Sequence, residues 1–271
     1  AGIPQVSYAS TSPALSDATA YPDFFRVVPS DALQGQALSA VVQADMPANG
    51  TVGLVYMTNA YGSGLADAFR ADFTADGTTL CADLGYEETM TDFSAAVQSM
   101  VDNGCTSAVL VSYAADGGMI IDEMNSQSWS GQVYGGDGIA EEGLATEATS
   151  SVNGVIATKP ASSSMGAVGY AFAALCAQSA ECTGGIYTAE AFDGVVLVAL
   201  AAFAQMASPG ATLSQVMMAT GQGLAGASGD ISFMANGDVP GAGYCVGDFT
   251  EDADGVSFDC NRSWDPANGM S

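Results

Sequence analysis

The sequence predicts an α/β protein with parallel, doubly wound sheets, and two observations support this fold class. Short apolar segments alternate with longer segments of helical periodicity from residue 2 to residue 159. The apolar segments are continuous rather than alternating with polar residues, which is typical of parallel strands covered by helices on both faces. Strands that alternate with helices in this way indicate βαβ units.

The elements of this first part follow one another in a regular order. Strands are expected over Gly2–Tyr8, Thr51–Met57, Thr79–Tyr86, Ser107–Tyr113, Gln132–Gly135 and Gly154–Lys159. A further strand is expected in the segment that ends before Pro29. Helices are expected between them over Asp31–Ala44, Gly64–Asp76, Phe93–Asn103 and Gly117–Gln127. Ser30 and Asp92 precede two of these helices and are residue types that cap helix amino termini.

After residue 159 the pattern changes to helices followed by strands. Helices are expected over Met165–Gln178, Thr188–Ala207 and Leu213–Thr220, and strands over Asp230–Met234, Tyr244–Asp248 and Val256–Asp259. The dipeptide Asn236-Gly237 between two apolar stretches predicts a hairpin. The longest apolar run, from Val195 to Phe203, is too short to span a bilayer, so no transmembrane segment is predicted.

The charge is strongly negative, with 30 acidic and 4 basic residues and a net charge of −26. Phosphate backbones are bound by Lys and Arg, so nucleic acid is excluded as a partner and an anionic membrane surface is disfavoured. We interpret the charge as a solvated surface that keeps the protein soluble. No run of acidic residues resembles a calcium loop, and the sequence predicts neither a metal site nor a cofactor.

The chain has no histidine, which limits the enzyme classes that remain open. Catalysis by Ser-His-Asp or Cys-His groups and zinc sites built on histidine are excluded. Lys159 could in principle form a Schiff base, but its place after an apolar strand and before Pro160 favours a surface lysine near a hinge. A hydrolase that uses two carboxylates stays open, but 30 acidic residues make chance pairs common, so this signal has little specificity.

Six cysteines permit fifteen pairings, and their local spacing favours three disulfides. The favoured pairs are Cys81–Cys105, Cys176–Cys182 and Cys245–Cys260. The alternative is six free buried thiols. The even number and the close neighbours favour disulfides, which indicate an oxidising compartment.

The segment from Gly2 to Gln36 resembles a stretch of the type I periplasmic solute-binding proteins, in the branch that delivers branched-chain amino acids to ABC importers. Other segments match the same family in the same order: Thr51–Tyr56, Tyr61–Gly64, Val109–Tyr113, Tyr134–Gly138, Glu190–Asp193, Gly229–Phe233 and Asn236–Asp238. Each match alone is weak, but their order and spacing together are specific.

This resemblance implies a type I periplasmic-binding-protein fold with two lobes, each a doubly wound parallel sheet, joined by three hinge crossings. The first lobe would hold residues 1–29 and 159–232, and the second would hold residues 30–158 and 233–271. In the family, the stretch that opens this sequence lies well inside the protein. The first lobe is therefore expected to lack about 100 residues of strands and helices.

The resemblance also implies the ligand-binding residues. In the first lobe these are Ala9, Ser10 and Thr11, whose backbone N–H groups and hydroxyls would hold the carboxylate and amine of an amino acid. The alternative for this stretch is an ordinary turn rich in Ser and Thr before Pro13.

In the second lobe, the resemblance implies two aromatic residues and one acid. Tyr61 would cover the ligand, and Tyr113 or the adjacent Ala114 would face the same cleft. The alternative for Tyr61 is a surface aromatic that packs on its own helix. Asp137 would bind the ligand's ammonium, with Gly136 and Gly138 allowing close approach. The alternative for Asp137 is an aspartate in an ordinary Asp-Gly turn.

The expected function is that of the extracytoplasmic substrate-binding component of an ABC importer. It would capture an amino acid or a similar small polar solute by hinge closure and then dock on a membrane permease, without enzymatic chemistry. Three alternatives remain: a ligand-sensing domain of the same fold, the carboxylate-dependent hydrolase, and a fragment that binds nothing. The expected location is the periplasm or the cell exterior, with a lipid anchor on the missing amino-terminal part as one arrangement.

Overall fold

Two groups of segments fold as separate units in the computed structural model, which describes residues 2–161, 166–179, 182, 185–253 and 255–271. Unit 1 comprises Ala1–Ser30 and Pro160–Ala242, and unit 2 comprises Asp31–Lys159 and Gly243–Ser271. The chain therefore passes between the units three times. The last passage lies ten residues beyond the expected position, because residues 233–242 make their contacts in unit 1.

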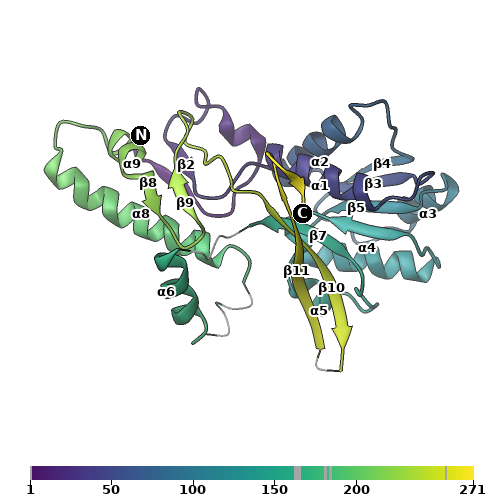
Figure 1. The fold of residues 1–271 in the computed structure, drawn as a ribbon. Coiled ribbons are helices and arrows are strands. Elements are labelled where there is room, and N and C mark those ends of the chain that lie inside the picture. The colour runs from purple at the N-terminus through teal and green to yellow at the C-terminus, as the bar shows by residue number, and fades with distance from the viewer. Residues whose placement is uncertain (1, 162–165, 180–181, 183–184, 254) are drawn as a thin grey trace. The chain divides into compact units, whose positions relative to one another are not determined.

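Unit 2 is built on an eight-stranded sheet with the strand order β12-β11-β10-β7-β6-β5-β3-β4 (Figure 1). Its strands are β3 (Val52–Met57), β4 (Ala82–Tyr86), β5 (Ser107–Val111), β6 (Gln132–Gly135), β7 (Ile156–Pro160), β10 (Tyr244–Asp252), β11 (Gly255–Asp265) and β12 (Gly269–Met270). Strands β3 to β7 pair in parallel, as expected. Strands β10, β11 and β12 pair antiparallel, so the sheet is mixed. The connection from β10 to β11 is too short for the crossover that a parallel pair needs.

Helices cover both faces of this sheet, which confirms the doubly wound arrangement for unit 2. On one face, α1 (Asp31–Asp45) and α2 (Ala60–Phe73) pack against Leu54 and Val109. On the other, α3 (Ser94–Asp102), α4 (Ala114–Ser126) and α5 (Gly143–Glu147) pack against Val55 and Leu110. Neighbouring strand residues point to opposite faces, so two covered faces require the continuous apolar runs seen in the sequence.

Unit 1 contains two small sheets instead of the expected doubly wound sheet. β1 (Gln5–Ser7) pairs in parallel with β2 (Phe24–Arg26), and β8 (Gln222–Ala225) pairs antiparallel with β9 (Asp230–Ser232). The 3₁₀ helix η1 (Pro13–Ser16) and helices α6 (Ala167–Cys176), α8 (Thr188–Ala207) and α9 (Leu213–Thr220) complete the described part of the unit. Phe25, Leu197, Val216 and Phe233 contribute to its core.

Most helices agree with the sequence prediction, with differences at their ends, and the short helix α5 was not predicted. The bounds of α8 and α9 agree with their predicted ranges, as do those of β6. Helix α2 begins at Ala60 rather than at Gly64, because the Asn59 side chain accepts a hydrogen bond from the Gly62 N–H at 2.8 Å. Helix α4 likewise begins at Ala114 rather than at Gly117. The predicted start of the helix at Met165 lies outside the described residues.

The predicted hairpin at Asn236-Gly237 is wrong. Strand β9 pairs with β8, and β10 pairs with β11, so no ladder joins β9 to β10 across this turn. Instead the turn lies against β2, where the Gly237 carbonyl accepts a hydrogen bond from the Arg26 N–H at 3.1 Å. A Cβ at position 237 would lie 2.2 Å from the Phe24 carbonyl oxygen, so this close contact requires glycine.

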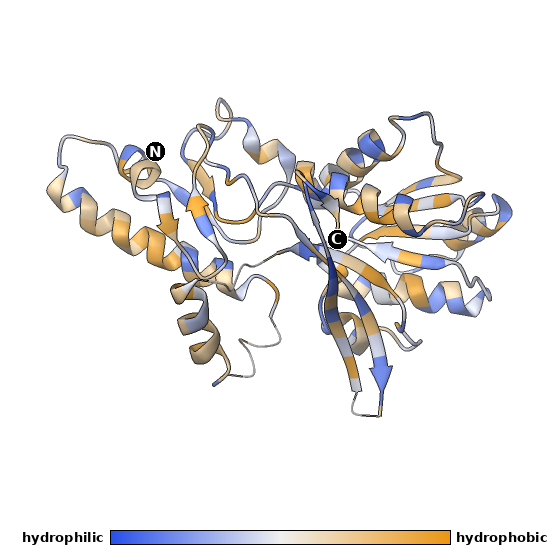
Figure 2. Ribbon diagram, viewed as in Figure 1, coloured by the Kyte–Doolittle hydropathy of each residue, from blue (hydrophilic) through white to orange (hydrophobic). Residues whose placement is uncertain are grey.

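Helix α8 is apolar along most of its length, as Figure 2 shows. By length and composition alone its 20 residues could cross a membrane, whereas the sequence analysis considered only the shorter run inside it. In unit 1, however, Leu197 and Ala201 are fully buried in the core. The buried Asp193 carboxylate accepts hydrogen bonds from the N–H groups of Ala227 at 2.6 Å and Ser228 at 2.8 Å. One face of α8 therefore packs in the core of unit 1, whereas Val195, Phe203 and Met206 on this helix are exposed.

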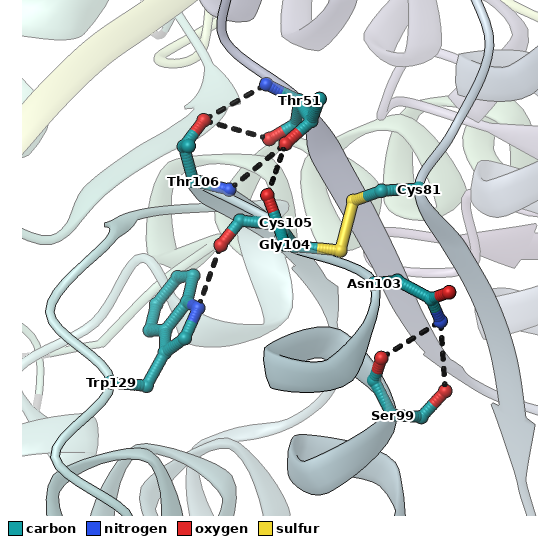
Figure 3. Close-up of a disulfide and its surroundings, with 8 residues drawn as sticks. All are labelled: Thr51, Cys81, Ser99, Asn103, Gly104, Cys105, Thr106 and Trp129. Carbon is teal, nitrogen blue, oxygen red and sulfur yellow. Dashed lines mark hydrogen bonds between the residues drawn. A yellow bond between two sulfur atoms is a disulfide. The ribbon is translucent and has the colours of Figure 1, made fainter.

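The three predicted disulfides are all present. Cys81 precedes β4 and Cys105 precedes β5, so their bond ties the two strands that flank β3 at the amino-terminal edge of the sheet (Figure 3). Beside it, the Thr51 N–H donates to the Thr106 hydroxyl at 2.9 Å, and the Trp129 indole N–H donates to the Cys105 carbonyl at 2.9 Å. The disulfide lies at the sheet edge opposite the strands' carboxyl ends.

Replacing Cys81 and Cys105 together by Ala should lower the free energy of unfolding by about 3 kcal/mol, because this cross-link closes a loop of 24 residues and restricts the unfolded chain. Urea unfolding followed by Trp fluorescence measures the effect, since Trp129 packs beside the bond. Six reactive thiols in denatured, unreduced protein would contradict the disulfide assignment.

Candidate functional site

Three of the predicted ligand-binding residues lie together in unit 2. Tyr61 is in the first turn of α2 after β3, Tyr113 lies between β5 and α4, and Asp137 follows β6 as the first residue of the 3₁₀ helix η2 (Asp137–Ile139). Strands β3, β5 and β6 are neighbours in the sheet. Their carboxyl ends therefore bring the three residues to one edge, where α/β sheets bind ligands.

One tyrosine hydroxyl joins these residues. The Tyr61 hydroxyl donates to the Asp137 carboxylate at 2.9 Å and accepts from the Gly138 N–H at 3.0 Å. The rings of Tyr61 and Tyr113 are stacked, with centroids 5.1 Å apart. Asp137 is only 4% exposed, whereas Tyr113 is 45% exposed. The Asp137 carboxylate is thus held inside the unit, and the Tyr113 ring is available on its surface.

The glycines on either side of Asp137 allow the loop that carries it to lie close to Tyr61 without a steric clash. A Cβ at Gly136 would lie 2.6 Å from the Leu65 side chain and 3.0 Å from the Tyr61 hydroxyl. A Cβ at Gly138 would lie 2.4 Å from the Ser112 carbonyl oxygen. In this structure the glycines therefore allow the loop to approach Tyr61 and β5.

Burial and negative charge keep both tyrosines protonated. Burial raises the pKa of Tyr61 well above its ordinary value, and the negative charges of Asp137 and Asp31 raise it further. Burial also raises the pKa of Tyr113, with smaller contributions from Asp137 and other nearby acids. The Tyr61 hydroxyl therefore remains a hydrogen-bond donor to Asp137 at neutral pH.

A second pair of residues, which the sequence analysis missed, supports Tyr113. The Tyr86 hydroxyl donates a hydrogen bond to the Asp116 carboxylate, which also accepts from the Tyr113 N–H at 3.1 Å. Burial raises the pKa of Asp116. The spacing of Tyr113 and Asp116 places the acid at the third position of α4, as in a capping box, and this signal could have identified Asp116 from the sequence.

The predicted first-lobe residues Ala9, Ser10 and Thr11 follow β1 in unit 1. The N–H groups of Ala9 and Ser10 donate to the Ser7 hydroxyl at 3.4 and 2.9 Å, so the turn of Ser and Thr residues is partly satisfied by its own side chain. Ala9 and Ser10 are exposed, whereas Thr11 is buried. The Ala9 N–H, which was expected to hold a ligand carboxylate, therefore already has an acceptor.

Arg26 is the functional candidate that the sequence analysis missed in unit 1. It is fully buried, and its guanidinium donates to the carbonyls of Thr11 at 2.8 Å and Ser12 at 3.0 Å. The Arg26 Nε also forms an ion pair with Asp238 at 2.7 Å. The usable signal in the sequence was a basic residue within an apolar strand of a chain that has four basic residues.

Within the parts of the chain that the structure describes, two observations bear on a metal site and on a Schiff-base lysine. No three His, Cys, Asp or Glu side chains are grouped there as a metal site would require. The Lys159 ammonium lies 4.9 Å from the centroid of the Phe258 ring, a cation–π contact. This position fits a structural lysine at the end of β7.

Comparisons with known proteins identify a family. The family model described as "Receptor family ligand binding region" matches residues 1–252. Metabotropic glutamate receptor 6 of Oryctolagus cuniculus is 60% identical over 42 residues, which are 16% of this chain and 5% of the receptor. Leu/Ile/Val-binding protein homolog 3 of Brucella melitensis is 28% identical over 142 residues, which are 51% of this chain and 37% of that protein. The matches thus span well under half the length of these relatives.

Solved structures show the fold. A leucine binding protein of Thermotoga maritima superposes with a TM-score of 0.81 at 19% identity, covering 95% of this chain and 72% of that one. A branched-chain amino acid transporter substrate binding protein of Streptococcus pneumoniae, in complex with isoleucine, gives a TM-score of 0.76 at 22% identity and covers 95% and 73%. The fold is that of the type I periplasmic binding proteins.

The buried tyrosine predicts a loss of stability in alkali. Unfolded Tyr ionises near pH 10 and folded Tyr61 only above that, so the stability that its neutral form contributes should be lost as the pH rises above about 10. We expect Tyr61→Phe to reduce the slope of the unfolding free energy against pH in urea titrations between pH 9 and 11. Tyr170→Phe, at an exposed site, is the control. Identical slopes for Tyr61→Phe and wild type would contradict the burial of this hydroxyl.

Proposed function

The chain belongs to the family described as the receptor family ligand binding region, and from this premise we propose that it is the extracytoplasmic substrate-binding component of an ABC importer. Its ligand is an amino acid or a similar small polar solute. The observation that carries the proposal is the buried Asp137 carboxylate beside the Tyr61 hydroxyl and the exposed Tyr113 ring. Relatives named for leucine, isoleucine and valine support the ligand class.

Asp137 supplies the charge that an ammonium group needs. The Asp137 carboxylate is 4% exposed, so a cation beside it would be poorly hydrated and would interact with it more strongly than at the surface. The ammonium of an amino acid would provide such a cation. The exposed Tyr113 ring offers an apolar and cation-attracting surface for the rest of the molecule.

Ligand capture would proceed by closure of two lobes on the solute, a mechanism we infer from the family. A ligand that binds the closed form better shifts the population toward that form. The closed form would then dock on a membrane permease outside the cytoplasm, and the protein could be lipid-anchored there. The family and the fold are those of binding and receptor proteins, so we propose no covalent chemistry.

A ligand-sensing domain is the second candidate function. The similarity to a metabotropic glutamate receptor favours it, because that relative is named as a receptor. Both functions use the same ligand site and differ in the membrane partner. Affinity capture of that partner from membranes of the source organism distinguishes them: an importer yields a permease, and a sensor yields a signalling protein.

The charges around the site also restrict the ligand. The basic residues Arg70 and Arg262 are paired with acids, at 2.7 Å from Asp83 and Asp45 respectively. Arg26 is buried in unit 1, and the Lys159 ammonium lies over the Phe258 ring. The charges that act on Tyr113 are those of acids, namely Asp137, Glu88 and Asp116. We therefore propose that the ligand's side chain is uncharged or cationic.

We expect glutamate to bind at least about tenfold more weakly than leucine at low ionic strength, because its second carboxylate would face these acids. Calorimetric titration with both amino acids measures the ratio, and added salt should reduce it. Tighter binding of glutamate than of leucine would refute the charge restriction while leaving amino acid binding in place.

Asp137→Asn should weaken amino acid binding at least about a hundredfold, because removing one partner of a desolvated charge pair costs about 3–5 kcal/mol. The Asn side chain can still accept the Tyr61 hydrogen bond, so circular dichroism should show an unchanged fold. Asp102→Asn, at the exposed end of α3, is the matched control and should bind like wild type. Unchanged affinity in Asp137→Asn, measured by calorimetry, would refute the ammonium assignment.

A further inference from the structure

Arg26 is the largest fully buried side chain in the described part of the chain, and it holds the loop that follows β1. One guanidinium nitrogen, Nη1, donates to three successive carbonyl oxygens, those of Ser10 at 3.2 Å, Thr11 at 2.8 Å and Ser12 at 3.0 Å. The other, Nη2, donates to the Ser16 hydroxyl at 2.7 Å. A single side chain thus fixes both ends of the loop from residue 10 to residue 16.

The counter-charge comes from a segment that is distant in the sequence. Asp238 accepts from the Arg26 Nε at 2.7 Å and from the Ser16 hydroxyl at 2.6 Å. Asn236 donates to the same carboxylate at 2.9 Å. The guanidinium is therefore occupied on every nitrogen and neutralised within unit 1, so it is not itself a ligand contact.

The carbonyl contacts determine where the loop's N–H groups point. In a trans peptide the carbonyl of one residue and the N–H of the next point in opposite directions. Because the carbonyls of Ser10 and Thr11 point toward Arg26, the N–H groups of Thr11 and Ser12 point away from it. The carbonyl of Ser12 precedes Pro13, which has no N–H. The three carbonyl contacts of Arg26 therefore direct two N–H groups, those of Thr11 and Ser12.

These two donors have no acceptor within the described residues. Thr11 is 3% exposed and Ser12 is 7% exposed, so bulk water satisfies them poorly. Buried backbone N–H groups in folded proteins nearly always have a partner. Two neighbouring backbone N–H groups without one are donors that a carboxylate can accept from.

We propose that Arg26 is a positioning residue, which never touches the ligand but holds the loop so that the Thr11 and Ser12 amides meet the ligand's carboxylate. That the carboxylate belongs to an amino acid rests on the proposed function. Lys would not replace Arg26, because an ammonium is a point charge that cannot reach the three carbonyls, Ser16 and Asp238 together.

The experiment compares Arg26→Lys with wild type using two matched probes. Leucine carries a carboxylate, and 3-methylbutylamine is the same molecule without it. Calorimetry should show leucine binding weakened about tenfold or more by Arg26→Lys, with 3-methylbutylamine unchanged, because only the carboxylate contacts the loop. Arg70→Lys, at a surface ion pair of unit 2, is the control and should leave both affinities unchanged.

Acetate serves as a bare carboxylate and tests the proposal without an amino acid. In wild type it should shift the amide proton resonances of Thr11 and Ser12, and in Arg26→Lys it should not. If leucine fails to bind wild type but acetate shifts these resonances in wild type and not in Arg26→Lys, the proposed function fails and the role of Arg26 stands. If acetate shifts neither resonance in wild type, or if Arg26→Lys weakens leucine and 3-methylbutylamine equally, the positioning role is overturned.

Two milder variants keep the test decisive if Arg26→Lys does not fold. Ser16→Ala and Asp238→Asn each remove one contact of the guanidinium or its charge partner and keep the three carbonyl contacts available. Each should reduce the ratio of leucine to 3-methylbutylamine affinity, by less than Arg26→Lys. An unchanged ratio in both folded variants would overturn the proposal.

Discussion

The hydrogen bond from the Tyr61 hydroxyl to the Asp137 carboxylate is the contact on which the second unit's site depends. It joins the first turn of α2 to the loop after β6 and requires glycine on both sides of the acid. It also keeps a carboxylate inside the unit with little access to water. Tyr113 stacks on the same tyrosine and is held in turn by Asp116 and Tyr86. The buried Asp137 carboxylate, the Tyr61 hydroxyl and the exposed Tyr113 ring thus form a group that favours a positively charged ligand.

The first unit uses a buried charge differently. Arg26 and Asp238 neutralise each other, and the remaining donors of Arg26 hold the backbone carbonyls of a loop. A buried ion pair adds little to stability compared with apolar packing, but removing one partner is costly. Such a pair is therefore better explained by the geometry it imposes than by the stability it adds. Under the two proposals, unit 2 offers a charge for an ammonium and unit 1 offers backbone donors for a carboxylate.

Sequence reasoning reached Tyr61, Tyr113 and Asp137 through the family resemblance. The fold brings them together because each follows a strand, and adjacent parallel strands bring their carboxyl ends to one edge. Sequence reasoning reached the disulfides because each pair is close in the chain. It missed the Arg26–Asp238 pair because 212 residues separate the partners, and no local pattern reports such a contact. The Asn236-Gly237 turn was misassigned for a related reason: its turn propensity is local, but its position is set by contact with β2. In unit 1 the small sheets likewise depend on pairings that local periodicity does not specify.

The most direct test of the role of Asp137 is a crystal structure of the protein grown with the amino acid that binds it. We predict that the ligand's ammonium nitrogen lies about 3 Å from an oxygen of Asp137, with the Tyr61 hydroxyl still bonded to that carboxylate. A bound ligand whose positive charge is compensated by other groups and lies far from Asp137 would contradict this role.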